Sequence, residues 1–154
     1  MAKVAIVMGS ESDRDVAREA IPYLDFFGID SELKVMSAHR TPDIVHQFAA
    51  GAEKAGYDVI LACAGLAAHL PGVIASFTSL PVIGIPLSAG ALNGLDALYS
   101  IVQMPAGVPV ATMAIGKAGV RNAGIFAAQI ISRYAPEVAV KIKEFKANQC
   151  KLPK

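Results

Sequence analysis

Short apolar segments that alternate with helical ones are the feature that most constrains the fold of this chain. The segments at 3–8, 58–64 and 81–86 contain few polar side chains, and turn residues such as glycine and serine lie close to them. Continuous apolar runs of this length are typical of parallel strands that are buried on both faces. Strands that alternate with helices predict a parallel sheet joined by right-handed crossovers.

The pattern predicts five strands, each followed by a helix. Five strands suit a flavodoxin-like doubly wound fold, a three-layer α/β sandwich whose parallel sheet has the order 2-1-3-4-5. No linker or repeat interrupts the pattern, so residues 1–134 are expected to form one domain. The expected strands span 3–8, 29–37, 58–64, 81–86 and 108–113, and the expected helices span about 14–28, 43–56, 72–79, 96–103, 117–134 and 137–148.

The final helix belongs to a C-terminal extension, residues 135–154. Val138, Ile142 and Phe145 recur at helical spacing, so this helix has an apolar stripe that needs a partner. The sheet already has helices for both faces, and we therefore expect the stripe to pack on a neighbouring subunit. The alternative is an ordinary extra helix packed on its own domain.

The composition indicates a protein that buries surface against copies of itself. Hydrophobic residues make up 54% of the 154 residues, whereas the formal net charge is +1. Nothing in this balance suggests a nucleic-acid partner, which would require basic clusters. No apolar run reaches the roughly 18 residues of a membrane-spanning helix. A homo-oligomer with large interfaces explains the excess of apolar residues best.

The two cysteines show no sign of redox or metal chemistry. Cys63 lies in an apolar strand, where a buried thiol is expected, and no CxxC spacing is present. No set of histidine, cysteine and acidic residues has metal-ligand spacing, so we predict no metal. The sequence begins directly in an apolar strand, which leaves no room for a signal peptide and predicts a cytoplasmic location.

The most reactive group of side chains follows the second expected strand. Ser37, His39 and Arg40 lie within four consecutive positions there. Thr41 and Pro42 then supply a helix start, as N-cap and first helical residue. Ligands of open α/β sheets bind at this edge. Histidine titrates near neutrality, so His39 is a candidate general acid–base, and Arg40 offers donors for phosphate or carboxylate.

Three strand-to-helix turns gather small and polar residues, at Gly9–Asp13, Ser37–Pro42 and Ala64–Gly72. They follow three strands that are neighbours in the order 2-1-3-4-5, so the turns converge. Helix N-termini and serine hydroxyls favour a phosphate, and Asp13 is an acceptor suited to a sugar hydroxyl. The turns therefore predict a ribose-phosphate ligand. Simple N-capping is the alternative role for the polar residues of the first turn.

The other two histidines are weaker candidates. His69 lies in the third turn and is a candidate for the same cleft, with capping or packing as an equal alternative. His46 lies one turn into a helix and is expected at the surface or at a subunit interface. The glycine-rich turn at 116–119 is expected to start a helix, with anion binding as the alternative.

Five motifs occur in order along the chain: Met8–Asp13, Ser37–Pro42, Ala67–Gly72, Tyr99–Pro105 and Ala114–Gly119. Together they resemble the N5-carboxyaminoimidazole ribonucleotide mutase family of purine biosynthesis. The resemblance covers nearly the whole chain up to about residue 134, whereas the final helix matches only in character. It implies a flavodoxin-like homo-octamer with active sites at subunit interfaces, acting without ATP, metal or another cofactor.

The implied reaction converts N5-carboxyaminoimidazole ribonucleotide to 4-carboxy-5-aminoimidazole ribonucleotide through enclosed carbon dioxide. A separate ATP-dependent synthetase would supply the substrate as a shared metabolite, without a need for physical contact. The resemblance implies that His39 is the general acid–base. It implies Ser10, Ser12, Asp13, Ser37 and Arg40 as nucleotide-binding residues, and Ala64, Gly65, Ala67, Ala68, His69 and Leu70 as the wall of the carboxylate and carbon dioxide pocket.

Alternatives remain open within and outside the family. A second branch carboxylates aminoimidazole ribonucleotide directly, but its histidine is typically followed by lysine, so Arg40 and Ala67–Gly72 favour the mutase branch. Leu66 departs from the pattern, which has a second glycine after Gly65; its side chain either narrows the pocket or points outward. A non-catalytic domain that binds flavin mononucleotide is the competing class, although the chain contains no tryptophan and 6% aromatic residues.

Overall fold

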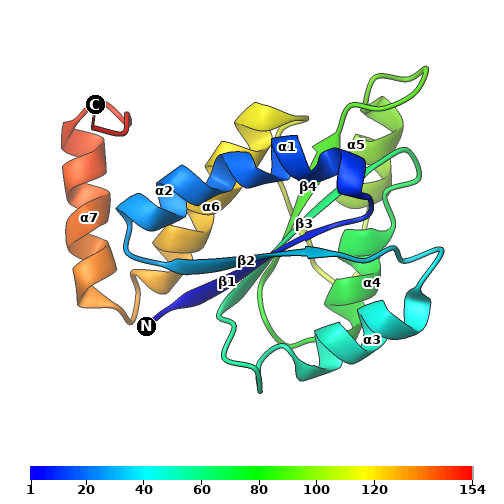
Figure 1. Ribbon diagram of the computed structural model, residues 1–154, viewed down its shortest axis with the longest axis horizontal. Coiled ribbons are helices and arrows are strands. Elements are labelled where there is room, and N and C mark those ends of the chain that lie inside the picture. The colour runs from blue at the N-terminus through cyan, green and yellow to red at the C-terminus, as the bar shows by residue number, and fades with distance from the viewer. Residues whose placement is uncertain (154) are drawn as a thin grey trace.

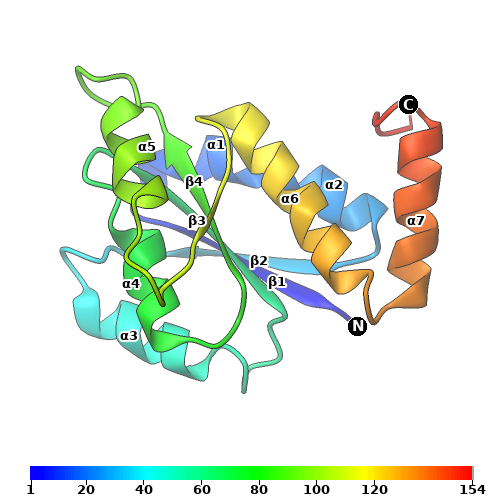
Figure 2. The same ribbon diagram turned by 180° about the vertical axis from the view of Figure 1, so that it is seen from behind.

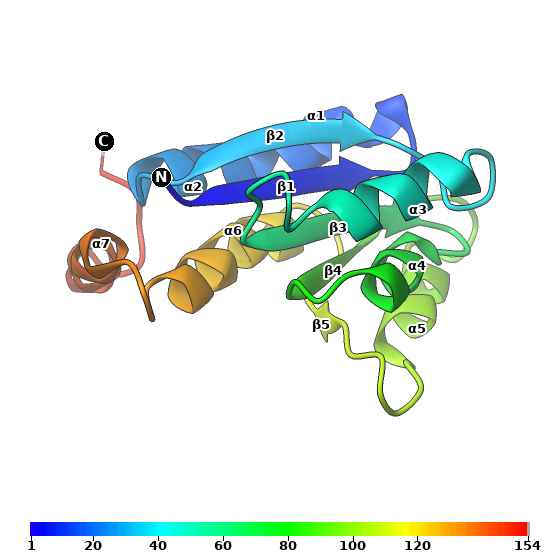
Figure 3. The same ribbon diagram turned by 90° about the horizontal axis from the view of Figure 1, so that it is seen from below.

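The chain forms a three-layer α/β sandwich around one parallel sheet (Figures 1 and 3). The computed structural model describes residues 1–153. The strand order is β2-β1-β3-β4-β5, as predicted. The strands are β1 (Lys3–Met8), β2 (Asp30–Val35), β3 (Val59–Gly65), β4 (Val82–Leu87) and β5 (Ala111–Thr112); the helices are α1 (Arg14–Ala17), α2 (Ile21–Phe26), α3 (Pro42–Gly51), α4 (Leu70–Phe77), α5 (Leu95–Val102), α6 (Lys117–Ile131) and α7 (Pro136–Ala147).

Alternate side chains of the central strands pack into two separate cores. Val4, Ile6 and Met8 of β1 pack with α1, α2 and α6, whereas Ala5 and Val7 pack with α3, α4 and α5. All five are fully buried. Burial on both faces explains why the central strands are continuous apolar runs in the sequence.

The strand register aligns the ends of the first three strands. Met8 pairs with Val35 of β2 on one side and with Cys63 of β3 on the other. The turns that follow these strands therefore leave the sheet at one edge, which is where open α/β sheets bind ligands.

The first helix differs from the single long helix that we expected. It is broken into α1, a 3-10 turn (Arg18–Ala20) and α2. Pro22 has no amide hydrogen to donate to the carbonyl of Arg18, and that carbonyl accepts from the backbone N–H of Ile21 instead. A proline in the middle of the predicted helix therefore converts one turn to 3-10 geometry.

Other boundaries also differ from prediction: β2 ends at Val35 and α4 at Phe77, each two residues early. The fifth strand is only two residues long, because Pro109 lacks a donor and the N–H of Val108 bonds back to Pro105 in a turn. Helix α3 ends at Gly51, before the turns that lead to Gly56, and α6 ends at Ile131, three residues early.

Helix α7 lies beside α2 and α6 at the end of the sandwich away from α3–α5 (Figure 2). Val138 and Phe145 are buried, and the Phe145 ring lies 5.5 Å from that of Phe27 and 6.1 Å from that of Phe26. The apolar stripe of α7 is therefore covered by its own chain. Contact with a neighbouring subunit stays a prediction, which would involve the other face of α7, where Val140 is 55% exposed.

No helix among residues 1–153 is both long enough and apolar enough to cross a membrane.

Candidate active site

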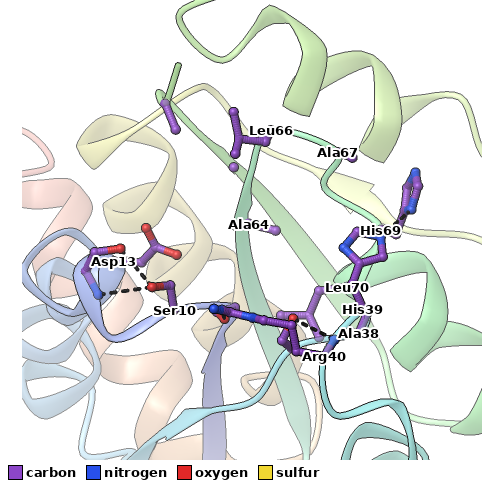
Figure 4. A pocket seen from close by; sticks show the side chains of 15 residues that line it. Ser10, Asp13, Ala38, His39, Arg40, Ala64, Leu66, Ala67, His69 and Leu70 are labelled. Carbon is purple, nitrogen blue, oxygen red and sulfur yellow. Dashed lines mark hydrogen bonds between the residues drawn. The ribbon is translucent and has the colours of Figure 1, made fainter.

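The three polar turns meet in one cleft of about 480 Å³ at the carboxyl edge of the sheet (Figure 4). This volume falls within the usual range for small-molecule sites. Ala68 alone among the predicted site residues is absent from the lining, because it is 1% exposed and packs into the core under α3 and α4. The predicted residues that line the cleft are Ser10, Ser12, Asp13, Ser37, His39, Arg40, Ala64, Gly65, Ala67, His69 and Leu70.

The first turn is held by its own serines. Ser10 Oγ accepts from the hydroxyl of Ser12 at 2.9 Å and from the Ser12 backbone N–H at 3.4 Å. The capping role of Ser10 is therefore confirmed. Asp13 makes no side-chain capping bond to α1, but its carboxyl accepts from the backbone of Ser10, as the acidic residue of a capping box does.

The Asp13 carboxyl is the acidic group of the cleft. Burial raises the pKa of Asp13 above its ordinary value, whereas a hydrogen bond from the Ser10 backbone and the charge of Arg40 act in the opposite direction. A carboxyl that is partly desolvated but still faces the cleft is suited to accept a hydrogen bond from a neutral ligand hydroxyl.

Arg40 ties the second turn to the first. Its Nη2 donates to the carbonyl oxygen of Gly9 at 2.8 Å, and its backbone N–H donates to Ser37 Oγ at 3.3 Å. A guanidinium has five N–H donors, so most of them stay available to an anion in the cleft. The Arg40 side chain is thereby held at the cleft while remaining exposed.

Thr41 is the N-cap residue of α3, as predicted, although its side chain makes no hydrogen bond to the helix. Its Oγ1 accepts from the backbone N–H of Ser37 at 3.0 Å and donates to the carbonyl oxygen of Ser37 at 3.1 Å. Pro42 does occupy the start of the helix. Both bonds join Thr41 to the backbone of Ser37, so they close the turn that contains His39.

His39 and His69 are in direct contact. The distance from His39 Nε2 to His69 Nδ1 is 2.8 Å, and the two rings meet edge to face with centroids 4.9 Å apart. His69 occupies the N-cap position of α4, but its side chain makes no capping bond and lines the cleft instead. His46 is exposed on α3 and stacks on Phe77, outside the cleft.

Small apolar residues form the wall opposite Arg40 in Figure 4. Ala64 and Gly65 end β3, and Ala67 follows. Leu66 and Ala89 also line the cleft. Ala89, in the loop after β4, was not predicted from the sequence. The sheet order could have indicated it, because β4 lies beside β3 and the loop at its carboxyl end reaches the same edge.

Cys63 lies beneath the cleft and is not a nucleophile. Complete burial, together with the nearby charge of Asp13, raises the pKa of its thiol to about 12. The thiolate needed for nucleophilic attack is therefore scarce at neutral pH. Residues 1–153 also contain no cluster of three or more histidine, cysteine or acidic side chains that could hold a metal ion.

Fold and cleft together define a flavodoxin-like α/β protein whose cleft, at the carboxyl edge of the sheet, contains a histidine pair and an arginine. Residues 3–151 match the family model described as AIR carboxylase, and the chain belongs to this family.

Relatives at high identity carry one name, N5-carboxyaminoimidazole ribonucleotide mutase. The protein from Thermotoga maritima is 56% identical over 146 residues, covering 95% of this chain and 84% of the relative. The protein from Saccharolobus solfataricus is 57% identical over 145 residues, covering 94% of this chain and 90% of the relative. The crystal structure of Treponema denticola PurE superimposes with a TM-score of 0.85 at 29% identity, covering 97% of this chain and 92% of that one.

Proposed function

We propose that this chain is an N5-carboxyaminoimidazole ribonucleotide mutase of purine biosynthesis. Family membership and relatives of that name at 56% and 57% identity support the activity. The observation that carries the assignment is the contact between His39 and His69 in a cleft that Arg40 enters from one side and small apolar residues line on the other.

The polar half of the cleft binds the ribose phosphate. The Arg40 guanidinium and the hydroxyls of Ser10, Ser12 and Ser37 offer donors to a phosphate, and charge-assisted bonds of this kind are the stronger ones. Asp13 accepts from a ribose hydroxyl. The direction of the pKa shift of Asp13 agrees with this role, because a partly desolvated carboxyl gains from such a donor.

Proton transfer is the chemistry required of the histidines. Cleavage of the nitrogen–carbon bond leaves the electron pair on the exocyclic nitrogen and releases carbon dioxide. The nucleophilic ring carbon then forms a bond to that carbon dioxide. This carbon loses one proton and the nitrogen gains one, so a single acid–base group can serve both atoms. His39 takes this role, and His69 orients its ring through the 2.8 Å contact.

The test compares two substrates by the ultraviolet absorbance of the carboxylated product. One reaction contains N5-carboxyaminoimidazole ribonucleotide without added bicarbonate, and the other contains aminoimidazole ribonucleotide with carbon dioxide. Prompt product from the first alone supports the mutase. Efficient product from the second at modest carbon dioxide would favour the direct carboxylase. If a folded protein forms no product in either reaction, it is a non-catalytic nucleotide-binding domain.

The Arg40→Ala variant is expected to bind aminoimidazole ribonucleotide roughly 10–100-fold more weakly than the wild type, because it loses hydrogen bonds to a charged phosphate. Isothermal titration measures this directly, since the ligand does not turn over without carbon dioxide. Arg133→Ala, which changes an exposed arginine outside the cleft, is the control. Equal affinity of Arg40→Ala and the wild type would refute the phosphate-binding role.

The chain also assembles into a homo-oligomer, for which an octamer is the expected size. Three exposed apolar side chains of α5 recur at a spacing of three or four residues, which places them on one side of the helix, and a fourth lies in the turn before it. Exposed apolar surface of this kind is typical of an interface. Because hydrophobic residues make up 54% of the chain, a second copy of the same chain is the expected partner. The residues and their exposures are Leu92 60%, Leu95 45%, Tyr99 59% and Val102 46%.

Paired Leu95→Glu and Tyr99→Glu substitutions are expected to reduce the mass of the assembly seen by light scattering, because they place two charges in this apolar stripe. The mass of a wild-type octamer is eight times the 16.0 kDa of one chain. Val140→Glu is the companion variant, because it tests in the same way the neighbouring-subunit contact predicted for the exposed face of α7. If Val140→Glu alone disrupts the assembly, α7 rather than α5 forms the interface.

We place the enzyme in the cytoplasm, after a reaction that supplies its substrate. An N-carboxylated amine reverts readily to the amine and carbon dioxide, so a steady supply of it from bicarbonate is favoured by activation, and we assign the preceding step to an ATP-dependent synthetase. The two enzymes are linked by a shared metabolite, without a need for physical contact.

A further inference from the structure

Leu66 has an unusual backbone conformation at the edge of the cleft. Its φ is +55°, in the left-handed region. Leucine rarely adopts this region, because its Cβ is crowded there and its side chain makes no compensating hydrogen bond. Such strain persists only where the surroundings enforce it, and it is often found at functional sites.

The Leu66 side chain fits against a second loop. A Cβ added at Gly90 would lie 2.8 Å from Leu66 Cδ2, and one added at Gly65 would lie 3.1 Å from Ala89 Cβ. The turn after β3 and the loop after β4 therefore approach each other closely at residues 65 and 90, which have no side chains. The Leu66 side chain lies against this second loop.

Leu66 is also a large apolar side chain beside a polar cleft. It is 53% exposed and lines the same cavity as the histidine pair. In Figure 4 it lies on the side of the cleft away from Arg40, with Ala64 between them. A ligand that filled the cleft would therefore meet polar groups at one end and the Leu66 side chain at the other.

We propose that Leu66 is a specificity-determining residue that retains carbon dioxide in the cleft between its release from nitrogen and its capture by carbon. This assignment rests on the proposed mutase function. Carbon dioxide is small and uncharged once the nitrogen–carbon bond has broken, so no ion pair holds it. An apolar side chain at the edge of the cleft slows its escape and keeps water out.

The experiment measures how much aminoimidazole ribonucleotide is released for each molecule of carboxylated product. N5-carboxyaminoimidazole ribonucleotide is the substrate, both products are separated by chromatography, and the decarboxylation that occurs without enzyme is subtracted. The ratio is expected to rise roughly tenfold in Leu66→Ala and in Leu66→Gly, since pockets discriminate by about this factor for small apolar groups. Val140→Ala, equally exposed on α7, is expected to match the wild type.

Leu66→Gly also guards against misfolding, because glycine adopts a positive φ freely and is expected to leave the melting temperature unchanged or higher. If both variants gave the same ratio as the wild type, the proposed role of Leu66 would be overturned, whereas the mutase function would stand. A rise in Leu66→Gly without one in Leu66→Ala would also overturn it, because the backbone and not the side chain would then matter. A wild type that forms no carboxylated product would overturn the mutase function and this assignment with it.

Discussion

The His39→Asn variant is expected to lose about 10²–10⁴-fold in kcat, because it removes the proton transfer on which both halves of the reaction depend. Asparagine keeps the size and polarity of the side chain but does not take up a proton. The nucleotide contacts proposed for Arg40 and Ser10 are untouched, so the affinity for aminoimidazole ribonucleotide is expected to stay close to that of the wild type. Steady-state kinetics and isothermal titration give the two values.

His46→Asn is the matched control for this variant. His46 is exposed on α3 and contacts Phe77, not the cleft, so its replacement should leave kcat unchanged. If His39→Asn retained substantial turnover, His39 would not be the acid–base. His69, whose Nδ1 lies 2.8 Å from His39 Nε2, would then be the next group to replace.

The Gly119→Ala variant is expected to lose more than about 3 kcal/mol of unfolding free energy, a large part of the stability of a typical domain. A Cβ at this position would lie 1.7 Å from the carbonyl oxygen of Ala114 and 2.7 Å from its carbonyl carbon. Both are backbone atoms of the loop that enters α6. No side-chain rotation relieves the clash, so the loop or the helix must move.

Urea denaturation at one fixed protein concentration measures the loss, because an oligomer has concentration-dependent stability. Gly51→Ala is the control: nothing lies within 4 Å of its added Cβ, and Gly51 is in α3. Alanine is the better helix former, so this variant is expected to gain up to about 1 kcal/mol. If Gly119→Ala were as stable as the wild type, the result would contradict the close packing of the Ala114 backbone against Gly119.

The sheet could be predicted because its signal is local and repeated. The buried strands are continuous apolar runs, and alternation with helices leaves few topologies. Helix and strand ends were less predictable, since they depend on single hydrogen bonds. Pro22 splits the first helix through one lost amide, and Pro109 shortens β5 in the same way.

The site could be predicted in outline because the turns it uses follow neighbouring strands. The orientation of individual side chains could not, because it depends on contacts between turns. The 2.8 Å approach of His69 to His39 joins residues thirty positions apart. Ala68 lies between two cleft residues in sequence yet packs into the core, and Ala89 reaches the cleft from a loop without a polar motif.

The most direct test of the mutase reaction follows the carboxyl carbon itself. N5-carboxyaminoimidazole ribonucleotide labelled with carbon-13 in its carboxylate is converted by the wild-type protein in unlabelled bicarbonate, and the product is analysed by mass spectrometry. An enzyme that keeps carbon dioxide in its cleft gives a product that retains the label. A product whose carboxylate has equilibrated with the unlabelled pool would show that carbon dioxide comes from solution, and would contradict the enclosed transfer.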